Sequence, residues 1–302
     1  MTINIEDIED KDPWGGGTEK LAPEEVFGRK LPESKIPEDF LEAGRQFMFK
    51  GDVAKMFEDQ VIPRQVPGYN QMRLRLSQLA QRLVHPESGT VLDIGTSHGR
   101  MIRDILSGFI VLSKIEEARN IEFIGLDYEA EMLEYAEESI KEVAGHFEKQ
   151  LNFSPQVRWY NHDLRHGLVG NNSAFQLNDN SVGLVSSVLT LMFVPPEYRL
   201  RLYKQIHDVL QPGASFLLVE KTLGVGADHD DLFTDIYYDD KRRNGISEDA
   251  IAKKRASIGG YLIPWSEAQH RSTLEQAGFA SHNINVFWSD LQFKGFIATK
   301  SA

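Results

Sequence analysis

The chain has 302 residues, no cysteine and a formal net charge of −12 at pH 7, and 41% of its residues are hydrophobic. This length and apolar content permit one large domain or one domain with additions. The absence of cysteine excludes disulfides, thiolate nucleophiles and cysteine metal sites, and it is typical of a cytoplasmic enzyme. The acidic balance disfavours direct nucleic-acid binding, because phosphate needs a basic surface. No apolar run reaches about 18 residues, so no membrane span is expected.

The first 45 residues are predicted to form a flexible N-terminal arm, and residues 46–302 to form one domain. Residues 1–37 are rich in acids and are interrupted by four prolines and three consecutive glycines. They lack the basic start and the apolar centre of a signal peptide. Residues 38–61 have apolar spacing for one or two short helices. Apolar residues from Met72 to Leu83 then predict an amphipathic helix that leads to the first strand.

Residues 90–100 are predicted to run from a strand through a glycine turn into a helix. Val91, Leu92 and Ile94 form a short apolar run, Gly95 and Gly99 interrupt it, and helical spacing continues over about 99–117. A ligand can approach the backbone closely at such a turn. The glycines match neither the dinucleotide fingerprint nor a P-loop, so an ordinary strand-to-helix turn remains the alternative.

Strands and helices alternate after this turn. Strands are predicted at 121–126, 157–160, 182–191 and 216–219, and helices at 129–147 and 195–210. Such alternation is typical of a doubly wound parallel sheet that is covered on both faces. Residues 226–258 break the alternation and are predicted to form a helical lid insertion. A helix at 266–277, capped by Ser266 and ended by Gly278, precedes an antiparallel hairpin of strands 285–288 and 293–299 at the sheet edge.

Two aspartates follow the second and third predicted strands. Because the carboxyl ends of parallel strands meet at one edge, Asp127 and Asp163 are expected to lie beside the glycine turn. A carboxylate after the second strand can accept both hydroxyls of a ribose, and one after the third can accept the exocyclic amine of adenine. Each aspartate taken alone is as readily a loop or cap residue. No metal site is expected, because His162 and His166 lack a helix and a third ligand.

Together these residues resemble the class I S-adenosylmethionine-dependent methyltransferases. The matching stretches are Val91 to Gly99, Gly125-Leu126-Asp127, His162-Asp163-Leu164 and Gln211-Pro212-Gly213-Ala214. The resemblance implies a Rossmann-like, seven-stranded α/β sheet whose last strand is antiparallel, with S-adenosylmethionine as the cofactor.

Residues from about 45 to 300 resemble the carboxy-S-adenosylmethionine synthase family more closely. The shared stretches are Val66-Pro67-Gly68-Tyr69, Thr190-Leu191 with Phe193, Glu220-Lys221, Lys241-Arg242 with Asn244-Gly245, Ser247-Glu248, Lys254-Arg255 and Ala277-Gly278-Phe279. That family makes carboxy-S-adenosylmethionine from S-adenosylmethionine and prephenate, for use in tRNA wobble-uridine modification. The resemblance also implies a homodimer.

Site residues follow from this resemblance by position. The cofactor contacts of the family fall on Tyr69, Gly95, Thr96, Ser97, Asp127, Tyr128, Asp163 and Leu164. The arginine that holds the new carboxylate falls on Arg255, and a guanidinium suits that task because it can hold a carboxylate through two parallel bonds. Six of the 33 basic residues lie between positions 241 and 255, so a small anionic substrate is expected. A solvated helix face paired with nearby acids is the alternative for this patch.

One position departs from the family pattern. The asparagine that touches the cofactor after the fourth strand corresponds to Val188, whose side chain can neither donate nor accept a hydrogen bond. Ser186 or Ser187 is a possible substitute, although neighbouring strand residues point to opposite faces. A conventional methyltransferase acting on a small acidic molecule is therefore the alternative function. A third possibility is a catalytically silent cofactor-binding protein that uses residues 1–45 to engage a partner.

Overall fold

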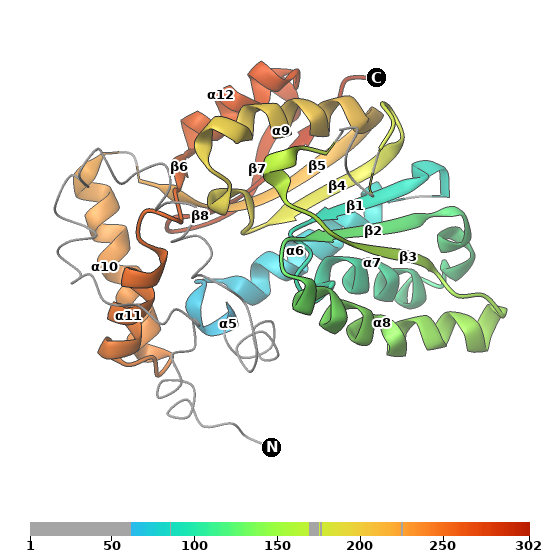
Figure 1. Ribbon diagram of the computed structural model, residues 1–302, viewed down its shortest axis with the longest axis horizontal. Coiled ribbons are helices and arrows are strands. Elements are labelled where there is room, and N and C mark those ends of the chain that lie inside the picture. Colours follow the sequence, from blue (N-terminus) through green and yellow to red (C-terminus); the bar gives the residue numbers. More distant parts are fainter. Residues whose placement is uncertain (1–61, 85, 169–174, 176, 225) are drawn as a thin grey trace. The chain divides into compact units, whose positions relative to one another are not determined.

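The computed structural model describes residues 62–302, apart from residues 85, 169–174, 176 and 225 (Figure 1). The predicted arm at 1–45 and the helices expected at 38–61 therefore lie outside the described residues. The chain divides into two compact units. Among the described residues, unit 1 contains those in 62–67 and 224–263, and unit 2 contains those in 68–223 and 264–302.

Unit 2 is built on one mixed sheet. Its strands are β1 (Thr90–Ile94), β2 (Glu122–Asp127), β3 (Gln156–Asn161), β4 (Val182–Val188), β5 (Leu210–Leu223), β6 (Trp265–Ser266), β7 (Ile284–Asp290) and β8 (Phe293–Thr299). The order is β3-β2-β1-β4-β5-β8-β7, with β1 to β5 parallel to one another and β8 antiparallel to both β5 and β7. This confirms the doubly wound sheet and its antiparallel edge hairpin. The short β6, which pairs with β5, was not predicted.

Helices cover both faces of this sheet (Figure 1). On one face lie α6 (Tyr69–Leu83), α7 (Arg100–Val111) and α8 (Ala130–Leu151), and on the other lie α9 (Pro196–Val209) and α12 (Glu267–Ala277). Short 3-10 helices connect them at η3 (Pro86–Ser88), η4 (Ile115–Asn120), η5 (Leu164–His166), η6 (Leu191–Phe193) and η7 (Ser281–Asn283). No helix of the described residues is long and apolar enough to cross a membrane.

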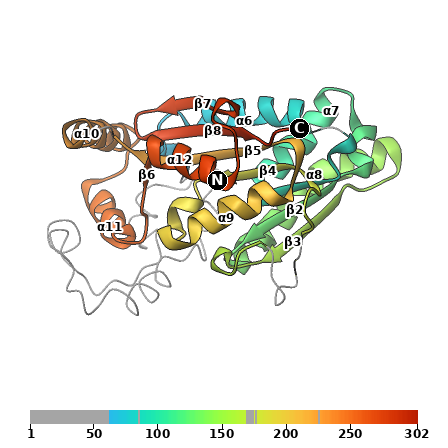
Figure 2. The same cartoon turned by 90° about the horizontal axis from the view of Figure 1, so that it is seen from above.

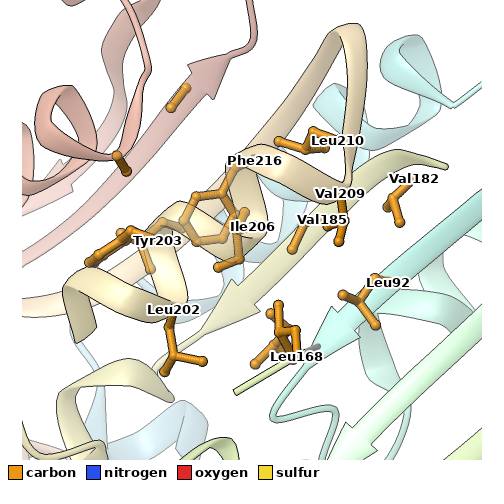
Figure 3. Packing of buried hydrophobic residues seen from close by; sticks show 14 of the residues in the cluster. Leu92, Leu168, Val182, Val185, Leu202, Tyr203, Ile206, Val209, Leu210 and Phe216 are labelled. Carbon is orange, nitrogen blue, oxygen red and sulfur yellow. The ribbon is translucent and has the colours of Figure 1, made fainter. Parts of the chain in front are cut away.

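The α9 side of the sheet carries a large apolar core, part of which is drawn in Figure 3. Helix α9 contributes Leu202, Tyr203 and Ile206, which recur at helical spacing and are fully buried. They pack toward Val185 of β4 and Phe216 of β5, which alternate along their strands toward the same face. Each such buried side chain contributes about 1.5–3 kcal/mol of hydrophobic stabilisation.

Two predicted elements end earlier in the structure. The helix expected over 99–117 stops at Val111, because Ser113 adopts a positive φ of 56° and the amide of Lys114 turns back to the carbonyl of Phe109 at 2.8 Å. The strand expected over 182–191 stops at Val188, because the next residue, Leu189, has a φ of 55°. A left-handed residue directs the chain out of the helix or strand in each case.

Strand β5, in contrast, is longer than predicted. It begins at Leu210 rather than Phe216, and its register with β4 shifts around Gly213, which has a φ of 81°. The helix predicted at 266–277 is confirmed as α12, with a capping box between Ser266 and Gln269 and Gly278 in the left-handed conformation.

Unit 1 supplies three helices to the described residues. These are α5 (Ile62–Gln65), α10 (Ala227–Arg243) and α11 (Glu248–Ile258). Helix α11 begins at the N-cap Ser247, whose hydroxyl accepts the amide of Ala250. In Figure 2, α10 and α11 are seen from above as two separate helical segments. The helical content expected for 226–258 is thus present.

Candidate functional site

The glycine turn at residues 95–99 folds back onto β2. The amides of Gly95 and Thr96 both donate to the carbonyl of Leu126 at 2.8 Å, and the amide of Gly99 donates to Thr96 at 2.8 Å. Backbone donors at a buried strand end need partners, and here β2 and the turn itself provide them. These amides consequently hold the turn in shape rather than pointing at a ligand.

Asp127, at the end of β2, is joined to this turn. Its Oδ2 accepts the amide of Ser97 at 2.8 Å, and its Oδ1 accepts the amide of Glu129, at the start of α8, at 2.9 Å. Burial raises the pKa of Asp127 to about 6, although both amide bonds act in the opposite direction. Each carboxylate oxygen can accept a further hydrogen bond, so the residue fits the two hydroxyls of a ribose.

The side chain of Thr96 is turned away from this edge. It is buried, and its hydroxyl donates to Asp93 Oδ2 at 2.7 Å, while the hydroxyl of Ser186 donates to Asp93 Oδ1 at 2.7 Å. Only the main chain of Thr96 is therefore left to contact a ligand. Ser186 is likewise engaged in the core, so it does not replace the amide that Val188 lacks.

Packing explains the glycines of the turn. A Cβ on Gly95, which has a φ of 70°, would overlap the side chain of Thr190 in the loop after β4. A Cβ on Gly99 would lie 2.7 Å from the indole of Trp159 on β3. The glycine turn, the end of β3 and the loop after β4 thus meet at one edge of the sheet, as expected from a parallel arrangement.

Asp163 is held by a residue that sequence reasoning missed. The Nε atom of Arg165 donates to both carboxylate oxygens of Asp163 at 3.0 and 2.9 Å, and the amide of Arg165 donates to Oδ1 at 2.9 Å. Burial raises the pKa of Asp163, but these bonds outweigh it and hold the pKa below its usual value. The amide of His162 donates to the carbonyl of Asp127 at 2.8 Å, so both predicted acids lie at the same edge.

Tyr128 lies beside this ion pair. Its ring is 48% exposed, and the centroid is 5.9 Å from the Arg165 guanidinium carbon. Leu164 is half-buried and begins η5. An exposed ring and an apolar side chain next to two carboxylates can contact the face and edge of a base. In the sequence, this partner could have been found from its position, because Arg165 follows the predicted adenine-binding Asp163 by two residues.

The other predicted site residues lie farther along the chain. Tyr69 is buried at the start of α6, after Gly68, whose φ is 61° and whose Cβ would collide with the Asp290 carboxylate of β7. Tyr69 belongs to unit 2, together with the glycine turn and both aspartates, whereas Arg255 belongs to unit 1. Arg255 is exposed on α11, with its guanidinium carbon 5.7 Å from the centroid of the Tyr238 ring.

A buried carboxylate supports the loop that follows β4. Glu220 of β5 is fully buried, and its Oε1 accepts the amides of Thr190 at 3.2 Å and Leu191 at 2.9 Å. Burial raises the pKa of Glu220 to about 7, against the opposing effect of the Arg199 charge. In the sequence, Glu220 stood after the fifth predicted strand and in a stretch shared with the synthase family, with no sign of its burial. Its hydrogen bonds link β5 to the loop that contacts the glycine turn.

Arg199 of α9 holds the same loop from its other end. It is fully buried, and it donates from Nε to the carbonyl of Val194 at 2.7 Å and from Nη2 to that of Met192 at 3.0 Å. Its guanidinium carbon lies 4.6 Å from the Trp265 ring centroid. The available signal was an arginine on the apolar stripe of α9, three residues before Leu202.

Within the described residues, no three His, Asp or Glu side chains are placed to hold a metal ion. His162 is instead buried, with Nε2 2.6 Å from the carbonyl oxygen of Gly167.

Comparison with known proteins agrees with this geometry. The family model described as a methyltransferase domain matches residues 91–213. Proteins named carboxy-S-adenosyl-L-methionine synthase from Methylococcus capsulatus and Shewanella amazonensis are each 32% identical over 254 residues, which is 84% of this chain and 93% of those proteins. An O-methyltransferase family protein from Burkholderia thailandensis has a similar fold, with a TM-score of 0.54 at 14% identity over 89% of this chain and 68% of that one.

Proposed function

The chain belongs to the carboxy-S-adenosyl-L-methionine synthase family, and on this premise we propose that it converts S-adenosylmethionine and prephenate into carboxy-S-adenosylmethionine. The observation that carries the proposal is the extent of the match. It covers 254 residues and 93% of the relatives, well beyond the methyltransferase domain at 91–213. A shared cofactor domain alone would match only that central part.

The chemistry demands positioning rather than acid–base catalysis by the protein. S-adenosylmethionine supplies a sulfonium methyl group, which loses a proton and forms a bond to the carbon of the carbon dioxide that prephenate releases. Aromatisation of the prephenate ring expels hydroxide, and this hydroxide can accept the methyl proton, so the atoms and charges balance. The chain then has to hold two reactants together and exclude water.

In this proposal the residues at the edge of the unit 2 sheet hold the nucleoside. Asp127 accepts the ribose hydroxyls, since the amides of Ser97 and Glu129 fix its carboxylate while leaving each oxygen able to accept one more bond. Tyr128, Leu164 and Asp163 flank the adenine. Arg255 holds the carboxylate, an assignment that rests on the family resemblance.

The experiment combines purified protein with S-adenosylmethionine and prephenate that carries carbon-13 in its ring carboxyl group. We expect labelled carboxy-S-adenosylmethionine by mass spectrometry. Arg255→Ala should lower its formation, whereas Arg243→Ala, on the exposed side of α10, should not. A wild-type protein that binds both compounds yet forms no labelled product would refute the synthase assignment.

A conventional methyltransferase is the second candidate, and Val188 is the observation that favours it. Its half-buried side chain offers no hydrogen bond at the end of β4. The ligand that stays bound through purification distinguishes the two. Carboxy-S-adenosylmethionine supports the synthase, whereas S-adenosylmethionine or S-adenosylhomocysteine supports methyl transfer to a small acidic molecule.

The remaining features of the proposal come from the family. We infer a cytoplasmic homodimer that takes a small anionic substrate, binds neither membrane nor nucleic acid directly, and feeds its product to tRNA wobble-uridine modification. Light scattering of the purified chain should give twice the chain mass. A monomeric mass would contradict the dimer without affecting the proposed reaction.

A further inference from the structure

Unit 1 contains a buried lysine outside the residues assigned so far. Lys241, near the end of α10, is only 4% exposed. Its Nζ lies 4.3 Å from the centroid of the Tyr237 ring and 5.6 Å from that of Tyr238. Within the described part of the chain, no carboxylate or carbonyl oxygen bonds to this ammonium group. Burial lowers its pKa to about 7, because aromatic faces replace water only in part.

Two further cations approach from α11. The Arg255 guanidinium carbon is 5.7 Å from the centroid of the Tyr238 ring, which Lys241 also contacts. Burial and the positive charge of Lys241 both lower the pKa of Lys254. Helix α5, which also packs against α10, brings one charged side chain, that of Arg64. Lys241 and Arg255 therefore both lie near the Tyr238 ring.

Three acids on α10 and α11 pair with arginines rather than with Lys241. Arg242 bonds to Asp239 and Glu248, and Arg243 bonds to Asp240 at 3.1 Å, all on the more exposed side of these helices. A buried charge without a counter-ion is unfavourable, and such groups concentrate at binding sites. The charge arrangement therefore favours an anionic ligand at Lys241.

We propose that Lys241 binds the carboxylate that prephenate retains, beside the same Tyr238 ring that Arg255 approaches, so that unit 1 recognises a small organic dicarboxylate. This inference rests on the proposed function, because it takes prephenate as the substrate. Lysine ammonium groups act as point charges and suit the retained carboxylate, which needs only to be anchored. The planar guanidinium of Arg255 suits the carboxylate whose orientation matters for transfer.

The test is titration calorimetry of the full chain with prephenate, in the presence of S-adenosylhomocysteine so that no methyl group can react. Lys241→Met should weaken prephenate binding about 10- to 100-fold, the value of a hydrogen bond to a charged group, and leave S-adenosylhomocysteine binding unchanged. Methionine fills the same buried space, and a thermal melt verifies folding. Arg243→Met is the matched control on the same helix.

A second readout separates ligand binding from a structural role. A bound carboxylate restores the pKa of Lys241, so the wild type should take up protons on binding near pH 7.5, and buffers of different ionisation enthalpy measure this uptake. Lys241→Met should lose most of it. The inference is overturned if the wild type does not bind prephenate, if Lys241→Met binds it equally well, or if phosphate or the monocarboxylate phenylpyruvate competes as strongly as prephenate.

Failure of the two proposals gives different results. Wild-type protein that makes carboxy-S-adenosylmethionine, together with an unaffected Lys241→Met, removes the dicarboxylate site and keeps the reaction. Lysine-dependent prephenate binding without labelled product supports the site and removes the reaction.

Discussion

Replacement of Glu220 by glutamine should change how the stability of the protein depends on pH. Glu220 is fully buried and has a pKa of about 7, compared with an ordinary value of 4.5. A carboxyl group whose pKa is raised on folding stabilises the folded state below its unfolded pKa, and this stabilisation is lost as pH rises through the folded pKa. The wild type should therefore lose stability from this group between pH 4.5 and 7, and a little beyond.

The size of the effect follows from the two pKa values. Glutamine does not titrate, so the stability of Glu220→Gln relative to the wild type should improve by about 1 kcal/mol between pH 6.5 and pH 8. Glutamine keeps an acceptor for the amides of Thr190 and Leu191. It leaves the buried charge of Arg199 without its carboxylate, so the variant should be less stable than the wild type at pH 6.5, by about 3–5 kcal/mol at most.

Urea unfolding of both proteins at several pH values from 6.5 to 8 measures this difference. Other titrating groups affect both proteins equally and cancel in the comparison. This cancellation matters because burial lowers the pKa values of Lys241 and His270, so these two groups make the folded state more stable as pH rises. Glu138→Gln, at an exposed position on α8, is the matched control. A pH-independent difference for Glu220→Gln would show that this carboxylate does not titrate near neutrality and would refute the reasoning.

Four further substitutions test other parts of the fold. Gly95→Ala should destabilise the protein by about 2 kcal/mol or more and weaken cofactor binding, because the new Cβ overlaps Thr190 at a position with a φ of 70°. Gly145→Ala has open space around the new Cβ in α8 and should stabilise the protein by about 0.5–1 kcal/mol. Urea unfolding measures both changes. Burial lowers the pKa of His270 to about 3, so the wild type loses stability as pH falls from 7 to 5. His270→Gln should make this loss smaller by about 2 kcal/mol, and an unchanged loss would contradict the reasoning. Lys300→Met should lower the melting temperature, because it removes the Nζ bonds at 2.8–3.3 Å to the carbonyls of His207 and Asp208 in α9 and of Leu210 directly after it. An unchanged melting temperature would exclude this capping role.

The sequence was informative wherever a local pattern was enough. Apolar alternation and helical spacing predicted every strand of the main sheet except the short β6, and the cap residues Ser266 and Gly278 predicted both ends of α12. Parallel strands carry their carboxyl ends to one edge, so the proximity of Asp127 and the glycine turn also followed from topology. The early ends of α7 and β4 were missed, because Ser113 and Leu189 adopt positive φ values that their residue types do not predict.

Tertiary structure alone decided which partner each polar side chain has. Thr96 looks like a ligand contact in sequence, but it bonds to Asp93 within the core, and Ser186, 93 residues away from Asp93, completes the same cluster. The burial of Glu220 and Lys241 is equally invisible to local patterns. Periodicity reports which face of an element is apolar, whereas the pKa and the role of a polar group depend on atoms brought from distant parts of the chain. For this protein the sequence therefore determined the sheet and the edge at which the candidate site lies, and folding determined the partner and the pKa of each polar group.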